Sequence, residues 1–118
     1  MNHPERTLQK QIFSWAKLAA GKYPCLRFMH GSMVGTNLSI QQAVMNKAMG
    51  VRSGFPDITL PFPNSSSHGL YIELKIKPNK TTLEQREYHA YLEEMGYTVF
   101  VIYDFETAIK VIEEYVRG

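Results

Sequence analysis

Three charged side chains occur in a segment whose apolar residues otherwise predict a β-hairpin. Asp57 begins the first apolar stretch, DITLPF, and Glu73 and Lys75 lie inside the second, LYIELKI. Alternate residues of a strand share a face, so Glu73 and Lys75 point the same way. Pairing Phe62 with Leu70 brings Asp57 opposite Lys75, whereas a slip of two residues brings it opposite Glu73. In either register, Asp57 joins the face that carries the other two charges.

This charged face has two interpretations. A hairpin often exposes one face to water, and a Glu and a Lys two residues apart are ordinary there. Glu5 favours a functional site instead, because it lies at helical spacing from Leu8 and Ile12 and so on the inward side of the first predicted helix. An acid in the first turn of a helix is also stabilised by the helix macrodipole, so Glu5 taken alone indicates a capping acid.

Carboxylates gathered on one face need a compensating positive charge. Two of them about 4 Å apart repel by roughly 4 kcal/mol at an effective dielectric of about 20. Oxygen ligands without His or Cys suit a hard divalent cation such as Mg²⁺ or Mn²⁺. Such a cation binds a phosphate oxygen and acidifies an attacking water, which Lys75 could orient. A purely structural cation site is the alternative, and chelation would then lower the melting temperature without abolishing an activity.

Helical periodicity predicts two helices in the first half of the chain. The first occupies HPERTLQKQIFSWAKLAAG, with Pro4 in its first turn and Gly21 at its end. The second occupies SIQQAVMNKAMG, where Ser39 and Gln42 have the spacing of a capping box.

Two more helices are predicted in the second half. The third begins after Thr82, which has capping-box spacing to Gln85, and ends at Gly96. Its apolar stripe contains Leu83, Tyr88, Tyr91, Leu92 and Met95. The fourth follows Asp104 as its N-cap. Its predicted core residues are Phe105, Ala108, Ile109, Ile112 and Tyr115.

Four strands are predicted between these helices: Leu26 to His30, DITLPF, LYIELKI and TVFVIY. Pro61 moves DITLPF to a sheet edge or a bulge, and the continuous apolar run TVFVIY predicts a strand buried on both faces. The segment from Leu70 to Tyr103 is a strand, helix, strand unit with parallel strands. The order α, β, α, β, β, α, β, α therefore predicts one α/β domain over residues 1–118, with a mixed sheet flanked by helices.

Composition leaves the partner of this domain open. The 118 residues carry a formal charge of +2 with a hydrophobic fraction of 44%, typical of soluble globular proteins. Cys25 is the only cysteine, which excludes an intramolecular disulfide and favours a reducing compartment. We expect a cytoplasmic protein, because the N-terminus has no secretory pattern and no apolar run would span a bilayer.

The charged triad belongs to a longer motif. Pro56-Asp57, fifteen further residues and then Glu73-Leu74-Lys75 resemble the degenerate PD-(D/E)XK signature of metal-dependent nucleases. The stretches GVRSGFPDITLP, HGLYIELK and TLEQREYHAYLEEMGYTVFVIYDFETAIKVIEEY are more specific, and they resemble the VRR-Nuc (virus-type replication-repair nuclease) family. The resemblance runs from Glu5 nearly to the C-terminus, and it implies the restriction-endonuclease-like PD-(D/E)XK fold.

The resemblance implies roles for individual residues. Asp57 and Glu73 would bind the metal, Mg²⁺ or Mn²⁺. The Leu74 carbonyl would add a ligand, and Lys75 would assist the nucleophile. Glu5, in ERTLQ, would reach the metal directly or through water.

Two further positions are less clear-cut. Gln85, in TLEQ, matches a glutamine that supports the site, although its place in a capping box explains it equally well. At FMHGS the family commonly has an asparagine before the glycine, where this chain has His30. A phosphate contact, acid-base chemistry and a mere strand end are the three interpretations of His30, and the last is favoured.

Polar and basic residues near the motif are candidates for DNA contacts through phosphates. These candidates are His30, Ser32, Lys47, Arg52, Ser53, Lys77 and Lys80. No base-reading helix, zinc finger or aromatic RNA-binding motif is recognisable, so recognition of DNA shape is expected.

The expected function is metal-dependent endonucleolytic cleavage of DNA. A chain this small resembles the phage and bacterial forms of the family that are linked to branched DNA such as four-way (Holliday) junctions. Symmetric cutting of a junction needs two active sites, which predicts a homodimer. The alternatives are a general or restriction-type endonuclease and a non-catalytic DNA-binding module with the same fold.

Overall fold

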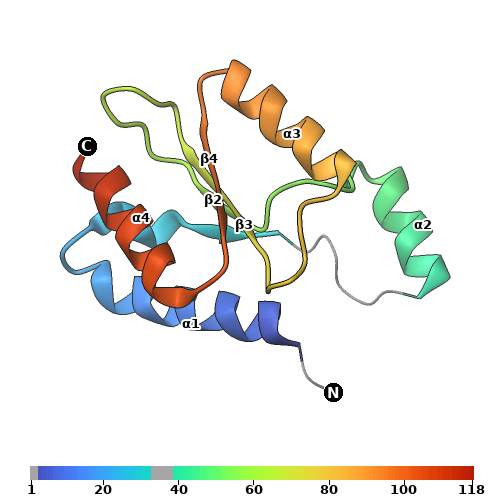
Figure 1. Ribbon diagram of the computed structural model, residues 1–118, viewed down its shortest axis with the longest axis horizontal. Helices are drawn as coiled ribbons and strands as arrows, with labels where there is room; N and C mark the ends of the chain where they lie inside the picture. The colour runs from blue at the N-terminus through green and yellow to red at the C-terminus, as the bar shows by residue number, and fades with distance from the viewer. Residues whose placement is uncertain (1–2, 33–38) are drawn as a thin grey trace.

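The computed structural model describes residues 3–32 and 39–118. Within these residues, a four-stranded mixed sheet has the order β1-β2-β3-β4 (Figure 1). Its strands are β1 (His30–Gly31), β2 (Ile58–Leu60), β3 (Leu70–Leu74) and β4 (Thr98–Ile102). β2 is antiparallel to both β1 and β3, whereas β3 and β4 are parallel and are connected through a helix. The predicted α/β class with a mixed sheet is confirmed.

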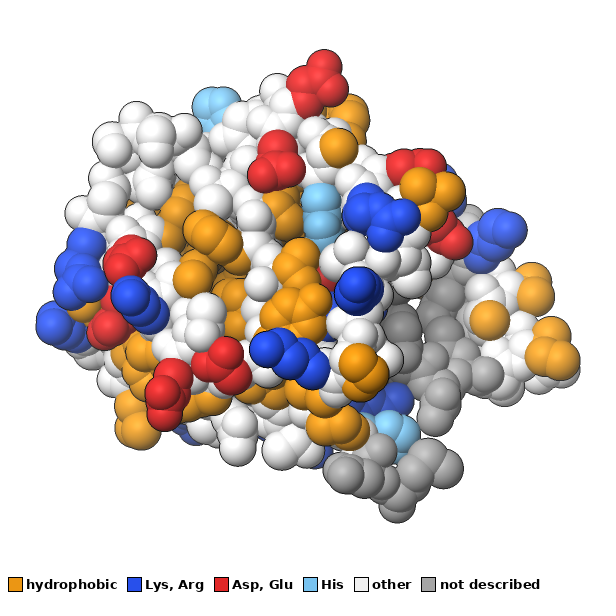
Figure 2. Space-filling view, viewed as in Figure 1, with side chains coloured by type: hydrophobic (Ala, Val, Ile, Leu, Met, Phe, Trp, Pro, Cys, Tyr) orange, Lys and Arg blue, Asp and Glu red, His pale blue; other side chains and the backbone are white. Residues whose placement is uncertain are grey.

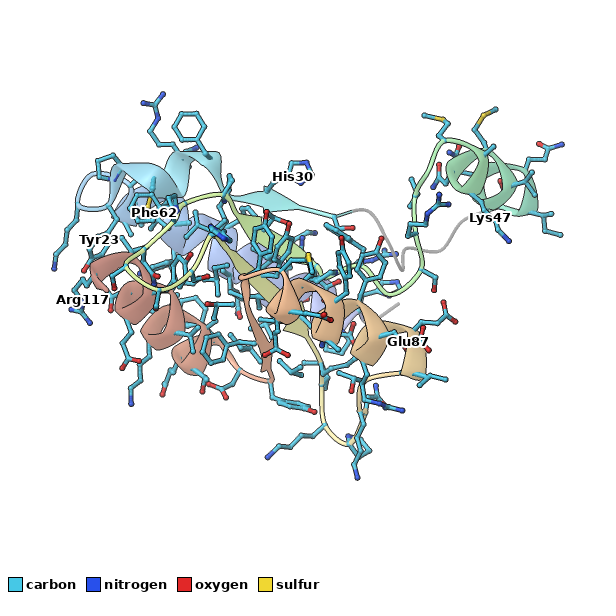
Figure 3. All side chains as sticks on the ribbon, turned by 90° about the horizontal axis from the view of Figure 1, so that it is seen from above. Tyr23, His30, Lys47, Phe62, Glu87 and Arg117 are labelled. Carbon is cyan, nitrogen blue, oxygen red and sulfur yellow. The ribbon has the colours of Figure 1, made fainter. Side chains whose placement is uncertain are left out.

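Helices cover both faces of this sheet. α1 (Pro4–Ala19) and α4 (Phe105–Arg117) pack on one face, and α3 (Leu83–Glu94) lies on the other (Figures 1 and 3). A short 3-10 helix, η1 (Pro24–Phe28), follows α1. α2 (Ile40–Ala48) stands apart from the sheet (Figures 1 and 3).

The two faces of β3 have different chemistry, and this difference positions the site. Leu70, Ile72 and Leu74 are buried in the core with apolar residues of α1 and α4. The alternate residues Tyr71 and Glu73 face the opposite side, under α3. One face of the strand therefore holds the core together, while the other face is free to carry polar chemistry.

The hairpin adopts the second of the two predicted registers. Ile58 pairs with Ile72 and Leu60 with Leu70, which brings Asp57 level with Glu73. The predicted N-caps are confirmed, but Gln42 donates its side-chain amide to Asn46 Oδ1, and only the Thr82 and Gln85 pair forms a complete capping box. Ser39 Oγ, Thr82 Oγ1 and Asp104 Oδ1 each accept a hydrogen bond from the backbone N–H three residues ahead.

Two strand predictions were wrong. Residues Pro24–Phe28 form η1 rather than a strand, and β1 begins only at His30. Pro24 explains the difference, because its fixed φ suits the first position of a helical turn. β2 is not an edge strand, since it lies between β1 and β3. It ends at Leu60, so Pro61 does not have to donate a ladder hydrogen bond.

The predicted burial of β4 and α3 was also wrong. β4 is an edge strand of the described sheet, and Phe100 remains 42% exposed rather than buried. On α3, Leu83, Tyr91 and Met95 are exposed. This helix covers the polar face of the sheet. Leu92 of the predicted stripe is buried as expected, and the other buried side chain of the helix is His89.

α2 contributes no buried residue at all. Its exposed apolar side chains, gathered at the right edge of Figure 2, are Ile40, Val44, Met45 and, just beyond its end, Met49. Within the described ranges, no helix combines the length and apolarity needed to cross a membrane.

Candidate functional site

One cavity of about 230 Å³ collects the residues of the predicted catalytic motif. We call it the site cavity. The predicted site residues that line it are Glu5, Ser32, Asp57, Glu73, Leu74, Lys75 and Gln85. They come from α1, the end of β1, the two hairpin strands and α3, so residues distant in sequence meet at one place.

Asp57 is held in position by the backbone of both neighbouring strands. Its Oδ2 accepts a hydrogen bond of 2.7 Å from the Leu74 N–H, and its carbonyl accepts one of 2.7 Å from the Ser32 N–H. Because Asp57 lies just before β2, the sheet pairing fixes its side chain beside β3. The carboxylate therefore has a defined orientation toward Glu73 without any help from a ligand.

Glu73 is the most perturbed acid of the site. Burial raises its pKa, and the negative charge of Asp57 and a hydrogen bond between the two carboxyl groups raise it further, to about 9. The positive charge of Lys75 acts in the opposite direction but does not offset these effects. In the metal-free chain, Glu73 is consequently protonated at neutral pH.

Lys75 directly follows Leu74, the last residue of β3. Its N–H donates to the Ile102 carbonyl over 3.0 Å, which extends the pairing with β4. The side chain is 9% exposed and lines the site cavity beside Glu73. A buried lysine needs a nearby negative charge, and the Asp57 carboxylate in the same cavity supplies it while Glu73 is protonated.

Gln85 joins α3 to the site through both ends of its side-chain amide. Its Oε1 accepts from the Thr82 N–H over 2.9 Å, which completes a capping box, and its Nε2 donates to Glu73 Oε2 over 3.2 Å. Gln85 therefore closes the capping box and contacts Glu73 at the same time. The first turn of α3 orients the glutamate.

The other oxygen of Glu73 faces His89, which sequence reasoning missed. His89 Nε2 lies 3.6 Å from Glu73 Oε1, too far for a hydrogen bond, and both buried atoms lack a partner among the described residues. Burial lowers the pKa of His89, so the ring is neutral at neutral pH. Its place four residues after Gln85, on the same face of a helix, was the available signal.

The donor set of the cavity fits a hard divalent cation. Mg²⁺ is typically bound by one or two carboxylates and waters, and Asp57 and Glu73 supply two carboxylates in contact. The unpartnered, buried Glu73 Oε1 is an oxygen for which a cation would compensate. Among the described residues, no three His, Cys, Asp or Glu side chains form a group able to hold an ion, so Glu5 does not join the pair as a third close carboxylate.

The remaining predicted DNA contacts lie outside the site cavity. His30 is exposed on β1, where it pairs with Thr59. Lys47 lies on the detached α2 (Figure 3). Lys77 and Lys80 are exposed in the connection between β3 and α3.

Arg52 and Ser53 line a different pocket, against α3. Three lining residues of the site cavity were not anticipated: Arg6, Gln9 and Phe55. Gln9 lies one helical turn after Glu5, so the helical spacing that singled out Glu5 also indicates Gln9.

Comparison with known proteins gives two consistent matches. The model of the VRR-NUC domain family matches residues 2–104. A solved structure described as a VRR_NUC domain protein is similar to this chain with a TM-score of 0.81 and 26% sequence identity. The similarity covers 99% of this chain and 91% of that one. No curated protein matches.

Proposed function

We propose that this chain, which belongs to the VRR-NUC domain family, is a metal-dependent deoxyribonuclease that hydrolyses phosphodiester bonds in the site cavity. Membership of the family implies a nuclease-type function with DNA as the substrate. The observation that carries the finer proposal is the meeting of Asp57, Glu73 and Lys75 in one cavity.

The metal ligands in this proposal are Asp57 and Glu73, with the Leu74 carbonyl as a further oxygen donor and Glu5 acting through water. Mg²⁺ or Mn²⁺ bound there would neutralise charge on the phosphate and lower the pKa of a water molecule. The hydrogen bond from the Leu74 N–H fixes the carboxylate of Asp57, and that from Gln85 fixes Glu73. Both acids are thus oriented before any ligand arrives, which reduces the reorganisation needed during the reaction.

Lys75 is the cation of the chain that acts on the reacting phosphate. Its ammonium group needs little movement to reach a phosphate in the site cavity, because the Lys75 side chain is already buried at the cavity wall. A positive charge in this water-poor place stabilises the extra negative charge that develops on phosphate oxygens. Arg6, on the α1 side of the same cavity, adds a second positive charge for binding the DNA backbone.

Branched DNA is the proposed substrate, and a twofold homodimer the proposed assembly. Two symmetric cuts on a four-way junction require two active sites at a fixed separation. The exposed apolar face of α2 (Ile40, Val44, Met45 and Met49) supports a contact with a second copy, because these side chains are 56% to 85% exposed in the described chain. A monomer at micromolar concentration in light scattering would contradict the homodimer. In a chain that is dimeric, an unchanged mass after Val44→Asp would instead contradict the contact through α2.

Phosphate contacts outside the cavity complete the proposal. The exposed residues His30, Lys47, Lys77 and Lys80 can reach DNA only beyond the cleavage point. Their contribution would be electrostatic, so binding should weaken as salt rises. Replacing a single lysine should reduce that salt dependence without changing where the DNA is cut.

The experiment that tests the function is cleavage of end-labelled four-way junction, flap and linear duplex DNA with Mg²⁺, Mn²⁺ or EDTA. Glu73→Gln should abolish cleavage and keep DNA binding within a few fold of the wild type. Glu94→Gln, an exposed acid at the end of α3, is the matched control and should cleave normally.

Each result separates the proposal from its rivals. Paired nicks on the junction alone support a junction-selective nuclease, whereas cutting of all three substrates indicates a general endonuclease. Binding without cleavage under any metal condition indicates a non-catalytic DNA-binding module. Full activity of Glu73→Gln would overturn the proposed mechanism.

A further inference from the structure

A second pocket, of about 470 Å³, lies beside the site cavity and has no role in the mechanism above. We call it the tyrosine pocket. Its lining residues are Arg52, Ser53, Glu84, Glu87, Tyr88 and Tyr91. The last four occupy one face of α3, and Figure 3 labels Glu87 on this helix. The first two belong to the segment that leads into Asp57.

Only a thin wall separates the two cavities. Gly54 has a φ of +89° and packs directly on the backbone of α3, where a Cβ atom would lie 2.7 Å from the Glu84 carbonyl oxygen. The next residue, Phe55, lines the site cavity and contacts the ring of Tyr88 edge to face, with ring centroids 5.5 Å apart. Gln85, on the same helix as Tyr88, also lines the site cavity.

Because the two cavities meet at the Phe55–Tyr88 contact, neighbouring nucleotides of one DNA strand can occupy them together. The rise is about 3.4 Å per nucleotide in a stacked strand and larger where the strand is unstacked. A strand whose phosphate lies in the site cavity therefore places the base of an adjacent nucleotide near the Phe55–Tyr88 contact. The tyrosine pocket is open on the far side of that contact.

The chemistry of the tyrosine pocket suits a nucleobase rather than a phosphate. Tyr91 is 58% exposed, and an exposed aromatic ring offers a surface on which any base can stack. Glu84 and Glu87 repel phosphate but accept hydrogen bonds from exocyclic amino groups such as cytosine N4. Arg52, at the opposite wall, supplies a positive charge for the connecting backbone.

We propose that the tyrosine pocket holds the unpaired base of a nucleotide next to the scissile phosphate, stacked on Tyr91 and read by Glu84 and Glu87. The proposal rests on the proposed nuclease function of the neighbouring cavity. A paired base inside a duplex is excluded, because entry would require it to leave the base stack and break its pairing. DNA that already has an unpaired base at a branch point avoids this cost, so the pocket selects branched over linear DNA.

Binding by the cleavage-deficient Glu73→Gln protein tests the pocket without interference from hydrolysis. The probes are flap DNAs that carry adenine, thymine or an abasic site at the first unpaired nucleotide. Tyr91→Ala should weaken binding of the adenine probe by about five-fold or more, while Tyr91→Phe should not. Phe28→Ala, which removes another exposed aromatic ring at a distance from the pocket, is the control and should have no effect.

The abasic probe isolates the base from the rest of the DNA. The protein that retains Tyr91 should bind the abasic probe about as weakly as Tyr91→Ala binds the adenine probe. Tyr91→Ala should not weaken binding of the abasic probe any further. Equal losses on the adenine and abasic probes would refute base stacking, and no loss on either would refute the pocket. Thymine lacks an exocyclic amino group, so it should bind more weakly than adenine. Equal affinity for the two would refute the role given to Glu84 and Glu87.

Failure of this inference is distinguishable from failure of the proposed function. If the wild-type protein cleaves flap DNA with metal and Tyr91→Ala cleaves and binds it equally well, the nuclease stands and the pocket falls. If no variant cleaves but the Tyr91 effect on adenine DNA is present, the pocket stands as a DNA-binding site and the nuclease proposal falls.

Discussion

Replacing Glu73 by glutamine should stabilise the metal-free protein at neutral pH, although it removes a proposed metal ligand. The pKa of Glu73 is about 9 in the folded chain, against an ordinary value of 4.5. Between these values the folded state keeps a proton that the unfolded state releases, so stability falls as pH rises. The contribution of Glu73 to the free energy of unfolding is fully present below pH 4.5 and is lost by about pH 9. Glutamine has no such proton to release and escapes the decline.

The size of the effect follows from the pH and the pKa of the unfolded state. For each pH unit above the pKa of Glu73 in the unfolded state, the free energy of unfolding of the wild-type protein falls by about 1.4 kcal/mol, as long as folded Glu73 stays protonated. At pH 7 the glutamine variant should therefore be more stable by about 3 kcal/mol, and at pH 5 by less than about 1 kcal/mol. For a domain of this length, 3 kcal/mol corresponds to a rise of roughly 10 °C in Tm.

The assay is thermal unfolding followed by circular dichroism in EDTA, at pH 5 and pH 7 and at constant ionic strength. Glu94→Gln removes an exposed acid at the end of α3 and controls for the change in side-chain charge. An equal gain in Tm at both pH values would refute the reasoning, because no protonation difference would then be involved. A loss of stability at pH 7 would show that Glu73 is ionised in the folded chain.

Three further outcomes are expected. Lys75→Ala should slow cleavage by about 100-fold while the Kd for Mg²⁺, measured by calorimetry, is unchanged; a similar loss in metal affinity would make Lys75 structural. Thr82→Ala should cost about 1 kcal/mol in urea unfolding through loss of the N-cap of α3, and an unchanged midpoint would show that the cap is dispensable. Ile12→Ala should lower the free energy of unfolding by about 2 to 5 kcal/mol. Trp15→Ala should lower it by less, because the Trp15 ring is only partly buried. A larger loss for Trp15→Ala than for Ile12→Ala would contradict the assigned buried face of α1.

Local chemistry explains which parts of the fold could be predicted from the sequence. Ser39, Thr82 and Asp104 were identified as N-caps because a cap depends on a few residues in a row. The alternation that put Asp57 and Glu73 on one face is equally local. The register between them was left open by two residues, because both pairings preserve that face and only the tertiary structure chooses one.

The errors occurred where burial depends on distant elements. Phe100 was predicted to be buried from its apolar neighbours, but its exposure follows from the edge position of β4, which no local pattern reveals. The apolar stripe of α3 was misassigned because this helix packs on a polar sheet face, where a buried histidine, His89, replaces an apolar residue. The exposure of α2 was unpredictable for the same reason.

The double role of Gln85 makes the start of a helix part of the geometry of the candidate site. Its oxygen is committed to the Thr82 N–H, so its NH₂ group is the end that must face Glu73. An α-helix turns by about 100° per residue, so starting α3 one residue earlier or later would swing this amide away from the glutamate. Insertions and deletions in the preceding loop are therefore tolerable only if they leave the phase of the helix unchanged. Gln85→Glu would keep the capping oxygen and lose the donor, which separates the folding role of this residue from its role in the site.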